Sequence, residues 1–325
     1  MPLFNFVSTG DLMNKHLTRR SLLAALLSSA VARPAPARPA AHLTVRTRGL
    51  SFPLLAWGES GGTPVLLLHG FPQDPWTWEP VAAALAAEGY WVLAPWQRGY
   101  AASNRAGPYT FATLTGDCLG LADALGLHTV HVAGFGIAGA VAWMLAASAP
   151  QRVRSITSIR FPHPAAFAQA LQADPEQQRK WHVLEEALGA GDPAGRAAHL
   201  LGQHAAGLKQ LLASAGLPAA SVARYVAHMQ SRGALQAALS WEQAISLPEF
   251  SQVAPVTVPA LLLWNDGPGL AASAADATGR YVHARYQQVQ LPEGQHFVLE
   301  STPAVVWQPL TSWLQGVTDR ARTRT

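Results

Sequence analysis

Short apolar segments rich in Val, Ile and Leu recur along the chain and alternate with longer segments whose apolar residues recur every three to four positions. The first kind of segment predicts buried strands and the second predicts amphipathic helices. Strands that alternate with helices of this length form a mostly parallel, doubly wound sheet. The pattern therefore predicts an α/β fold of about eight strands, at residues 42–46, 52–57, 65–68, 91–94, 130–133, 153–159, 260–264 and 286–291.

The segment between the sixth and seventh expected strands has a different composition. Residues 163–250 are rich in Ala, Leu and Gln and contain no convincing strand. They predict about five short helices, interrupted by Gly and Pro in turns such as Gly191-Asp192-Pro193. We therefore expect a helical cap at 163–250, inserted into a core formed by residues 42–162 and 251–318.

The amino-terminal segment carries the features of an export signal. Arg19 and Arg20 precede an apolar run at 22–27 and the small residues Ala30-Val31-Ala32. This order predicts a twin-arginine-type signal peptide at 1–32, a Pro/Ala-rich linker at 33–41, and a periplasmic or secreted protein. The run is too short to serve as a stable membrane anchor. The alternative is an apolar start of the chain that is disordered and has no targeting role.

The positive charges lie at the two ends of the chain. The net charge is +4, but residues 1–42 hold five basic residues against one acidic residue, and the expected disordered tail 319–325 holds three against one. The remainder, 43–318, is therefore slightly acidic, at −2. A nucleic-acid partner is not expected, because binding to phosphates requires a basic stripe on the folded part.

The sequence GFGIAG at 134–139 allows two interpretations. It matches a glycine-rich dinucleotide-binding turn, but that turn follows the first strand of its unit and needs an acidic residue about 20 positions later. Here the turn follows about the fifth strand, and the stretch SITSIRFPHP at 155–164 contains no Asp or Glu. Arg160 could contact a 2′-phosphate, although a lone arginine is more often a solvated residue at the end of a strand. No cofactor is predicted.

The second interpretation draws on motifs at the ends of several other strands. His69-Gly70-Phe71-Pro72 follows the third, APWQRGY (94–100) the fourth, FPHPAAF (161–167) the sixth and EGQHF (293–297) the last. With these motifs the chain resembles the α/β-hydrolase family over residues 42–316, and in particular its capped branch of epoxide hydrolases and haloalkane or haloacid dehalogenases. Trp96 stands where the family usually has Asp.

The resemblance implies that GFGIAG is a nucleophile elbow. In such a turn a strained residue carries the nucleophile, and small residues flank it two positions away on either side. Gly134 and Ala138 are those small residues, and Gly136 stands at the position of the nucleophile. Glycine adopts the strained backbone at little cost. It has no side chain that could attack a substrate.

The resemblance also assigns the remaining catalytic positions. His296 corresponds to the general base, and Phe71 and Ile137 correspond to the backbone donors of the oxyanion hole. The orienting acid is expected after the seventh strand, where the stretch Trp264-Asn265-Asp266-Gly267-Pro268 is one residue short and places Gly267 at the position of the acid. Asp266 either reaches His296 from a shifted position or is a turn residue.

Substrate contacts are expected from aromatic side chains of the core and of the cap. Of the two cap tyrosines that epoxide hydrolases use, Tyr225 matches one, whereas Glu242 stands at the second position. Epoxide opening is therefore doubtful, and dehalogenation requires the missing carboxylate nucleophile. No metal site is predicted. The residues expected to bind substrate are Trp76, Phe135, Tyr225 and Trp241.

These features favour an exported protein with a hydrolase fold that binds a small hydrophobic molecule or performs non-covalent chemistry assisted by His296. A first alternative is an active hydrolase of small hydrophobic esters, epoxides or halides that uses an activated water. A second alternative is a non-catalytic interaction protein. The chain is expected to act as a monomer or a homodimer.

Overall fold

The computed structural model describes residues 40–188, 192–267, 269–294 and 296–322. Eight strands form one sheet in the order β1-β2-β4-β3-β5-β6-β7-β8. Strand β2 pairs antiparallel with β1 and with β4. All other neighbouring strands pair parallel. The eight predicted strands are confirmed, with ends that differ by up to two residues: β1 (Ala41–Thr47), β2 (Leu50–Trp57), β3 (Thr63–Leu68), β4 (Tyr90–Pro95), β5 (Val130–Phe135), β6 (Val153–Ile159), β7 (Ala260–Trp264) and β8 (Tyr286–Gln290).

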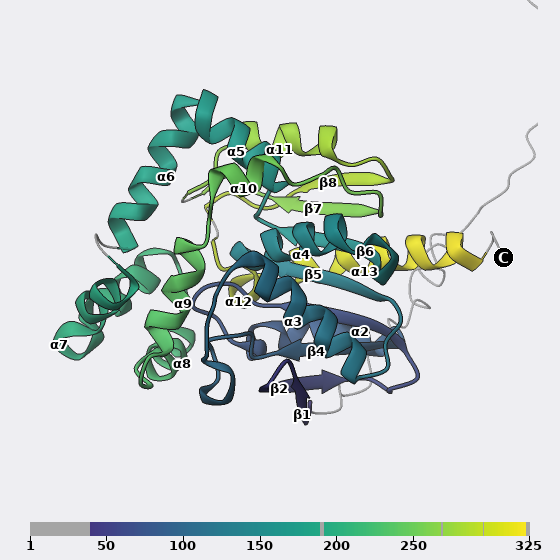
Figure 1. The fold of residues 1–325 in the computed structure, drawn as a ribbon, viewed down its shortest axis with the longest axis horizontal. Helices are drawn as coiled ribbons and strands as arrows, with labels where there is room; N and C mark the ends of the chain where they lie inside the picture. The colour runs from purple at the N-terminus through teal and green to yellow at the C-terminus, as the bar shows by residue number, and fades with distance from the viewer. Residues whose placement is uncertain (1–39, 189–191, 268, 295, 323–325) are drawn as a thin grey trace, which may run out of the picture. The chain divides into compact units, whose positions relative to one another are not determined.

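Helices cover both faces of this sheet (Figure 1). One face packs on α3 and α4 and the other on α2 and α13. Successive residues of β3 point to opposite faces, so that Leu66 and Leu68 join the first layer and Val65 and Leu67 join the second. The helices of the core are α2 (Glu79–Ala87), α3 (Phe111–Ala124), α4 (Ile137–Ser148), α11 (Ala272–Thr278), α12 (Val298–Ser301) and α13 (Ala304–Arg322), with short 3₁₀ turns η1 (Pro75–Trp78), η2 (Ala102–Asn104), η3 (Pro150–Arg152) and η4 (Gly279–Tyr281).

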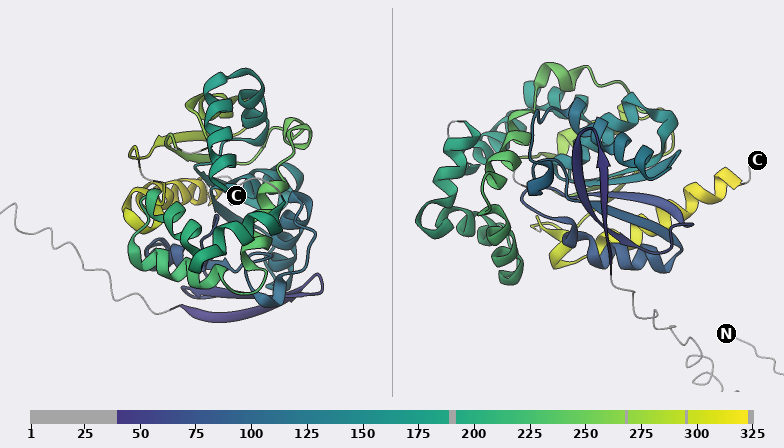
Figure 2. Two further views of the ribbon diagram at one scale, coloured as in Figure 1. Left: turned by 90° about the vertical axis from the view of Figure 1, so that its left-hand side faces the viewer. Right: turned by 60° about the horizontal axis from the view of Figure 1, so that its bottom comes forward.

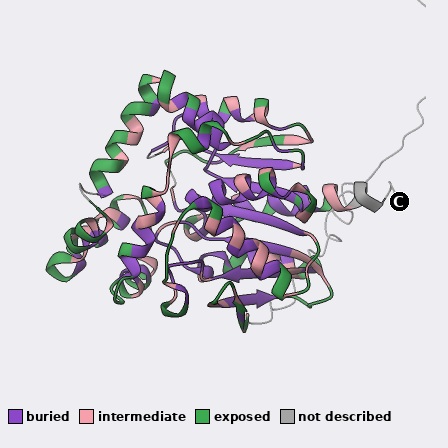
Figure 3. Ribbon diagram, in the orientation of Figure 1, coloured by how far each residue is buried: buried purple, intermediate pink, exposed green. Residues whose placement is uncertain are grey.

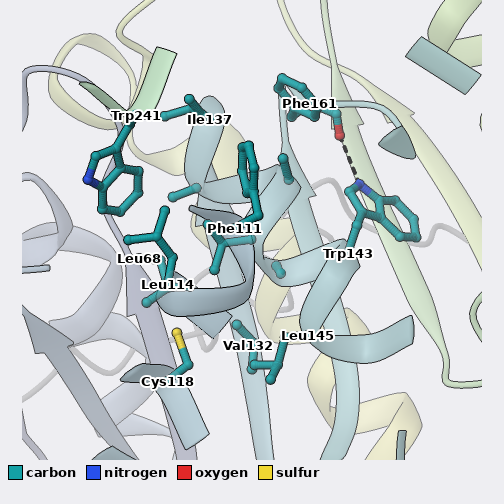
Figure 4. Close-up of a cluster of buried hydrophobic side chains, with 14 of the residues drawn as sticks. Leu68, Phe111, Leu114, Cys118, Val132, Ile137, Trp143, Leu145, Phe161 and Trp241 are labelled. Carbon is teal, nitrogen blue, oxygen red and sulfur yellow. Dashed lines mark hydrogen bonds between the residues drawn. The ribbon is translucent and has the colours of Figure 1, made fainter. Parts of the chain in front are cut away.

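The central strands are buried on both faces, as the purple strands of Figure 3 show. Figure 4 shows the cluster on the α3 and α4 side, which includes Cys118. In this cluster the indole Nε1 of Trp143 donates to the carbonyl of Phe161 at 3.0 Å. Ile137, the first residue of α4, belongs to the same cluster. Apolar packing therefore fixes the start of α4 relative to the end of β6.

A run of helices lies between β6 and β7, which confirms the predicted helical insertion. Figures 1 and 2 show α6 to α9 gathered at one end of the sheet. The longest of them, α7, is kinked where residues 202–205 leave the helical conformation. The inserted helices are α5 (Pro164–Ala173), α6 (Pro175–Leu188), α7 (Pro193–Ser214), α8 (Ala219–Met229), α9 (Ala234–Gln243) and α10 (Leu247–Ser251).

Buried polar contacts attach the cap to the core. The hydroxyl of Tyr225 on α8 donates to Oε1 of Glu300 on α12 at 2.6 Å. Gln73 and Thr77 donate to the same oxygen at 2.9 and 2.8 Å. On α9, Nε1 of Trp241 donates to the carbonyl of Arg98 at 3.1 Å. These contacts hold α8 and α9 at the end of the sheet where the motifs of the core lie.

The two ends of the chain correct one expectation and leave another open. Helix α13 continues to Arg322, so residues 319–322 are helical and do not belong to a disordered tail. The predicted signal peptide and most of the predicted linker lie outside the described residues. Within the part of the chain that the structure describes, no helix has the length and apolar character needed to cross a membrane.

Candidate functional site

The turn between β5 and α4 has the geometry of the predicted elbow. Gly136 adopts φ 55° and ψ −131°, and its N–H donates to the carbonyl of Ile159 at 2.9 Å. A Cβ atom on Gly134 would lie 2.2 Å from the carbonyl oxygen of Ala138, which explains the need for a small residue there. A Cβ on Gly136 would meet no atom within 4 Å. The place where a side chain of residue 136 would stand is therefore open.

The elbow forms part of the wall of a cavity of about 100 Å³ between the core and the cap. Five of the predicted site residues line this cavity together: Phe71, Phe135, Gly136, Ile137 and His296. They come from the ends of β3, β5 and β8, which parallel pairing brings to one edge of the sheet. The sequence motifs thus meet in space as the resemblance implied.

Two further cavities adjoin the first one along α6. One, of about 220 Å³, shares Phe71, Leu184, Leu188 and His296 with it. The other, of about 310 Å³, shares Leu184, Leu188 and Glu242 with it, among others. The three cavities therefore share parts of their walls along α6.

His296 lies between β8 and α12, with the rings of Phe135 and Phe297 at centroid distances of 6.1 and 4.6 Å. Its Nδ1 atom is buried and has no hydrogen-bond partner among the described residues. Burial, and then the positive charge of Arg160, lower the pKa of the imidazole to about 3. The ring is therefore neutral near pH 7 and is a weak base.

Asp266 does not orient His296. Its carboxylate is half-exposed, and its Oδ2 lies 3.1 Å from Nζ of Lys180 on α6. A carboxylate that oriented the ring would accept a hydrogen bond from Nδ1, and that atom has no such partner. Of the two interpretations left open by the sequence, the structure supports a turn residue on the surface. The shift in the backbone has turned this side chain toward solvent.

Arg160 occupies the space next to His296 where the resemblance places the acid. A Cβ on Gly267 would lie 2.1 Å from Nη2 of Arg160, so an acidic side chain at position 267 would require the end of the Arg160 side chain to move. Arg160 is 1% exposed, and its Nη1 donates to Oδ1 of Asn265 at 2.5 Å. Burial lowers the pKa of Arg160 to about 10, which leaves the guanidinium charged near pH 7. A cation therefore stands beside the imidazole in place of an anion.

The sequence did not indicate this role for Arg160, because residues 160 and 267 are far apart in the chain. They meet because β6 and β7 pair in parallel, and the N–H of Arg160 donates to the carbonyl of Leu263 at 2.8 Å. The signal that the sequence offered was Gly267, which stands where the resemblance places an acid.

Glu242 also lines the cavity, together with Arg160 and His296. Burial raises the pKa of its carboxyl to about 7, and the nearby charge of Arg196 partly opposes this shift. Glu242 is the one carboxylic acid among the described residues of the cavity wall. Its charge therefore changes in the range of neutral pH.

Three residues expected to contact substrate do not line the cavity at Gly136. Tyr225 is fully buried against Glu300, and Trp241 faces the carbonyl of Arg98. The ring of Trp76 contacts His42 at a centroid distance of 5.8 Å. None of the three belongs to the described wall of the cavity at Gly136. Their role in substrate binding stays a prediction.

The remaining site predictions concern metals and the oxyanion hole. Among the residues with described positions, no group of three or more His, Cys, Asp or Glu side chains could hold a metal ion. Ile137 is the first residue of α4, so its N–H has no partner within that helix. With Phe71 it lies on the wall next to the open place at Gly136.

Comparison with known proteins finds a matching family, related sequences and related structures. Residues 63–303 match the sequence profile of a family described as alpha/beta hydrolase fold. The chain is 28% identical over 281 residues to the AB hydrolase superfamily protein YfhM of Bacillus subtilis, covering 84% of this chain and 97% of the relative. It is 26% identical to epoxide hydrolase 4 of Mus musculus, over 86% and 80% of the two chains. The crystal structure of epoxide hydrolase A from Mycobacterium thermoresistibile superposes with a TM-score of 0.68 at 25% identity, over 85% of this chain and 98% of that one.

Proposed function

This chain belongs to the α/β-hydrolase-fold family, and we propose that it uses the fold to bind a small hydrophobic molecule between sheet and cap without bonding to it covalently. The resemblance predicted from the sequence motifs is confirmed at the level of family and fold. The proposal concerns the function of the cavity at Gly136, between the sheet and the cap.

The observation that carries the proposal is the open place at Gly136. Covalent hydrolysis in this fold needs a nucleophile at the elbow, and glycine offers none. The cavity next to it remains, at about 100 Å³, and its wall is mostly apolar, with Phe71, Phe161 and Leu270 among its members. A preserved apolar cavity also counts against a pure interaction protein, whose pocket would have no reason to stay open.

The surroundings of His296 support the same conclusion. A general base is most effective when its pKa lies near the working pH. The pKa of His296 is about 3, and the residue beside it is the cation Arg160. Activation of water by this imidazole is therefore weak.

Glu242 favours a second candidate function. Its pKa of about 7 suits proton transfer near neutral pH, and it lines the same cavity. In this candidate, Glu242 removes a proton from a water molecule whose oxygen attacks a carbon of a small ester, epoxide or alkyl halide. The carbon–oxygen or carbon–halogen bond breaks, the oxygen leaving group takes the proton from Glu242 or the halide leaves as an anion, and no covalent bond to the enzyme forms. Turnover by the wild type that rises with pH through about 7 and is absent in Glu242→Gln would support this function over binding alone.

The experiment that tests binding compares two tryptophan substitutions on α6. Leu184→Trp places an indole in the cavity wall, whereas His182→Trp adds the same ring at an exposed position of the same helix. We expect small hydrophobic molecules to raise the melting temperature of the wild type and of His182→Trp but not of Leu184→Trp. Fast hydrolysis of any ester, epoxide or halide by the wild type, or equal responses of the two variants, would contradict the proposal.

We also propose that the chain is exported by a twin-arginine route. The support is Arg19-Arg20 ahead of the apolar run at 22–27. We expect the exported chain to start near residue 33 and the Arg19→Lys, Arg20→Lys double variant to stay inside the cell. Exported protein that retains residues 1–30 would contradict this proposal.

A further inference from the structure

We propose that the bound molecule is an aliphatic monocarboxylate, and that the guanidinium of Arg160, the N–H of Ile137 and Nδ1 of His296 hold its carboxylate. This inference rests on the proposed binding function, and it names the chemical class of the ligand.

The position of Arg160 is the first argument. A guanidinium presents its N–H donors as a planar fork that matches the two oxygens of a carboxylate. Arg160 is 1% exposed and lines the cavity, so a ligand there meets this charge away from bulk water. Asn265 accepts a hydrogen bond from Nη1 at 2.5 Å, which orients the guanidinium. The carboxylate of Asp266, whose charge acts on Arg160, is half-exposed and contacts Lys180.

The backbone of Arg160 is the second argument. Its φ is +66°, in the left-handed region that a residue with a Cβ seldom adopts. Such a conformation is strained and is found preferentially at ligand clamps and active sites. The guanidinium of this residue lies over Gly267, beside the imidazole of His296.

Two further donors lie on the same wall. The N–H of Ile137 opens α4, a helix of 12 residues whose amino end carries a partial positive charge. His296 contributes Nδ1, a buried nitrogen that has no hydrogen-bond partner among the described residues. A neutral imidazole can carry its proton on Nδ1 and donate it to a carboxylate oxygen. Three segments of the fold thus contribute residues with hydrogen-bond donors to the wall of one cavity.

The rest of the cavity defines the body of the ligand. Its other lining residues are largely apolar, among them Phe71, Phe161 and Leu270, and about 100 Å³ is enough for a short hydrocarbon segment. The adjoining cavity of about 220 Å³, which includes Leu211 and Leu212, can take the end of a longer chain. A single guanidinium suits one negative charge, which favours a monocarboxylate over a phosphate.

The test uses a matched pair of probes, hexanoate and hexanamide, with titration calorimetry at pH 7 on the full chain. The two molecules have the same carbon chain and differ in charge at one end. Hydrogen bonds to a charged group contribute about 1.5–3 kcal/mol, so we expect hexanoate to bind the wild type roughly tenfold to hundredfold more tightly than hexanamide. In Arg160→Gln we expect the ratio of the two affinities to fall to about one. In the control Arg179→Gln, which removes an exposed positive charge on α6, we expect the wild-type ratio.

The results of this experiment separate the carboxylate inference, the role of Arg160 and the binding function. Equal affinities of the wild type for hexanoate and hexanamide would overturn the carboxylate inference and leave the binding function standing. An unchanged ratio in folded Arg160→Gln would overturn the role of Arg160. Absence of binding of both probes would contradict the binding function itself. The comparison of probes on the wild type needs no variant, so the inference stays testable if Arg160→Gln does not fold.

Discussion

Two buried arginines of this protein, Arg98 and Arg160, are held in opposite ways. Arg98 is 5% exposed and forms a bidentate pair with Asp117, with N···O distances of 2.5 and 2.6 Å. Its third contact is to the carbonyl of Ala106 at 2.7 Å. Arg160 is 1% exposed, lines a cavity, adopts a left-handed backbone and donates to the neutral amide of Asn265.

The difference lies in what surrounds each charge. The guanidinium of Arg98 is matched by the buried carboxylate of Asp117. Arg160 lines the wall of a largely apolar cavity, beside a neutral imidazole and the first residue of α4. Equally buried arginines can therefore have unlike surroundings, which their exposure alone does not distinguish.

The largest expected effect on stability belongs to Arg98. Arg98→Met leaves the buried carboxylate of Asp117 without its bidentate partner, and breaking a buried ion pair costs about 3–5 kcal/mol. Arg48, whose Nε lies 3.2 Å from Asp117, lessens the loss. We expect urea unfolding to show a clearly larger loss for Arg98→Met than for Arg160→Gln, with Arg179→Gln as an exposed control. Equal losses of unfolding free energy in Arg98→Met and Arg160→Gln would contradict the contrast between the two arginines.

The second prediction concerns the elbow. Gly136→Ser and Gly136→Asp place a residue with a Cβ at φ 55°, which costs about 1–3 kcal/mol, although the side chain meets no atom within 4 Å. Gly134→Ala in the same turn adds a backbone clash at 2.2 Å, so we expect a larger loss of unfolding free energy there.

Neither variant of Gly136 should hydrolyse esters or epoxides efficiently. Arg160 and Gly267 remain where an acid would orient His296, and members of a catalytic unit recover little activity when restored singly. Rapid turnover by Gly136→Asp in a steady-state assay would mean that Arg160 does not block the site, contrary to this account.

The third prediction is a pH dependence that arises from Glu242. Its pKa is about 7 in the folded state and near 4.5 when unfolded, so between these values the folded state binds more protons. Stability is therefore fully present well below pH 4.5 and falls as the pH rises through 7, by about 3 kcal/mol. Other buried acids, such as Glu300, titrate in the same direction. The difference between wild type and Glu242→Gln isolates the effect, and a difference that does not change with pH would contradict it.

The smallest effect is expected at Tyr225. Tyr225→Phe removes the hydroxyl that donates to Glu300 while Gln73 and Thr77 still donate to the same oxygen, so the cost is about 1 kcal/mol. Because Tyr225 does not line the cavity, we expect unchanged affinity for hexanoate. A large loss of affinity with little loss of stability would place this side chain in the binding site after all.

The strands, the cap and the elbow could be predicted because each depends on residues close together in the chain. Apolar periodicity and turn residues identify β5, Gly136 and the start of α4 within a dozen positions. The electrostatics of the site could not be predicted in this way. Arg160 and Gly267 come close to each other only because β6 and β7 pair in parallel. The role of Asp266 depends on the direction of its own side chain at a shortened turn. The sequence did not show that the aromatic residues Trp76, Tyr225 and Trp241 lie outside the described wall of the cavity at Gly136, because composition does not tell a cavity from a packed core.

The close approach of Arg160 to Gly267 has a consequence for the paths by which this sequence can change. Glycine and aspartate codons can differ by a single base, so Gly136→Asp and Gly267→Asp are each open to single mutations. The first adds backbone strain next to an imidazole that has no acid to orient it. The second requires the end of the Arg160 side chain to move, because its Nη2 would lie 2.1 Å from the new Cβ. We therefore expect neither single change to give an efficient hydrolase, and we expect a catalytic arrangement to require the side chain at position 160 to move or change as well. The three positions are therefore coupled, because the effect of a change at one of them depends on the residues at the other two.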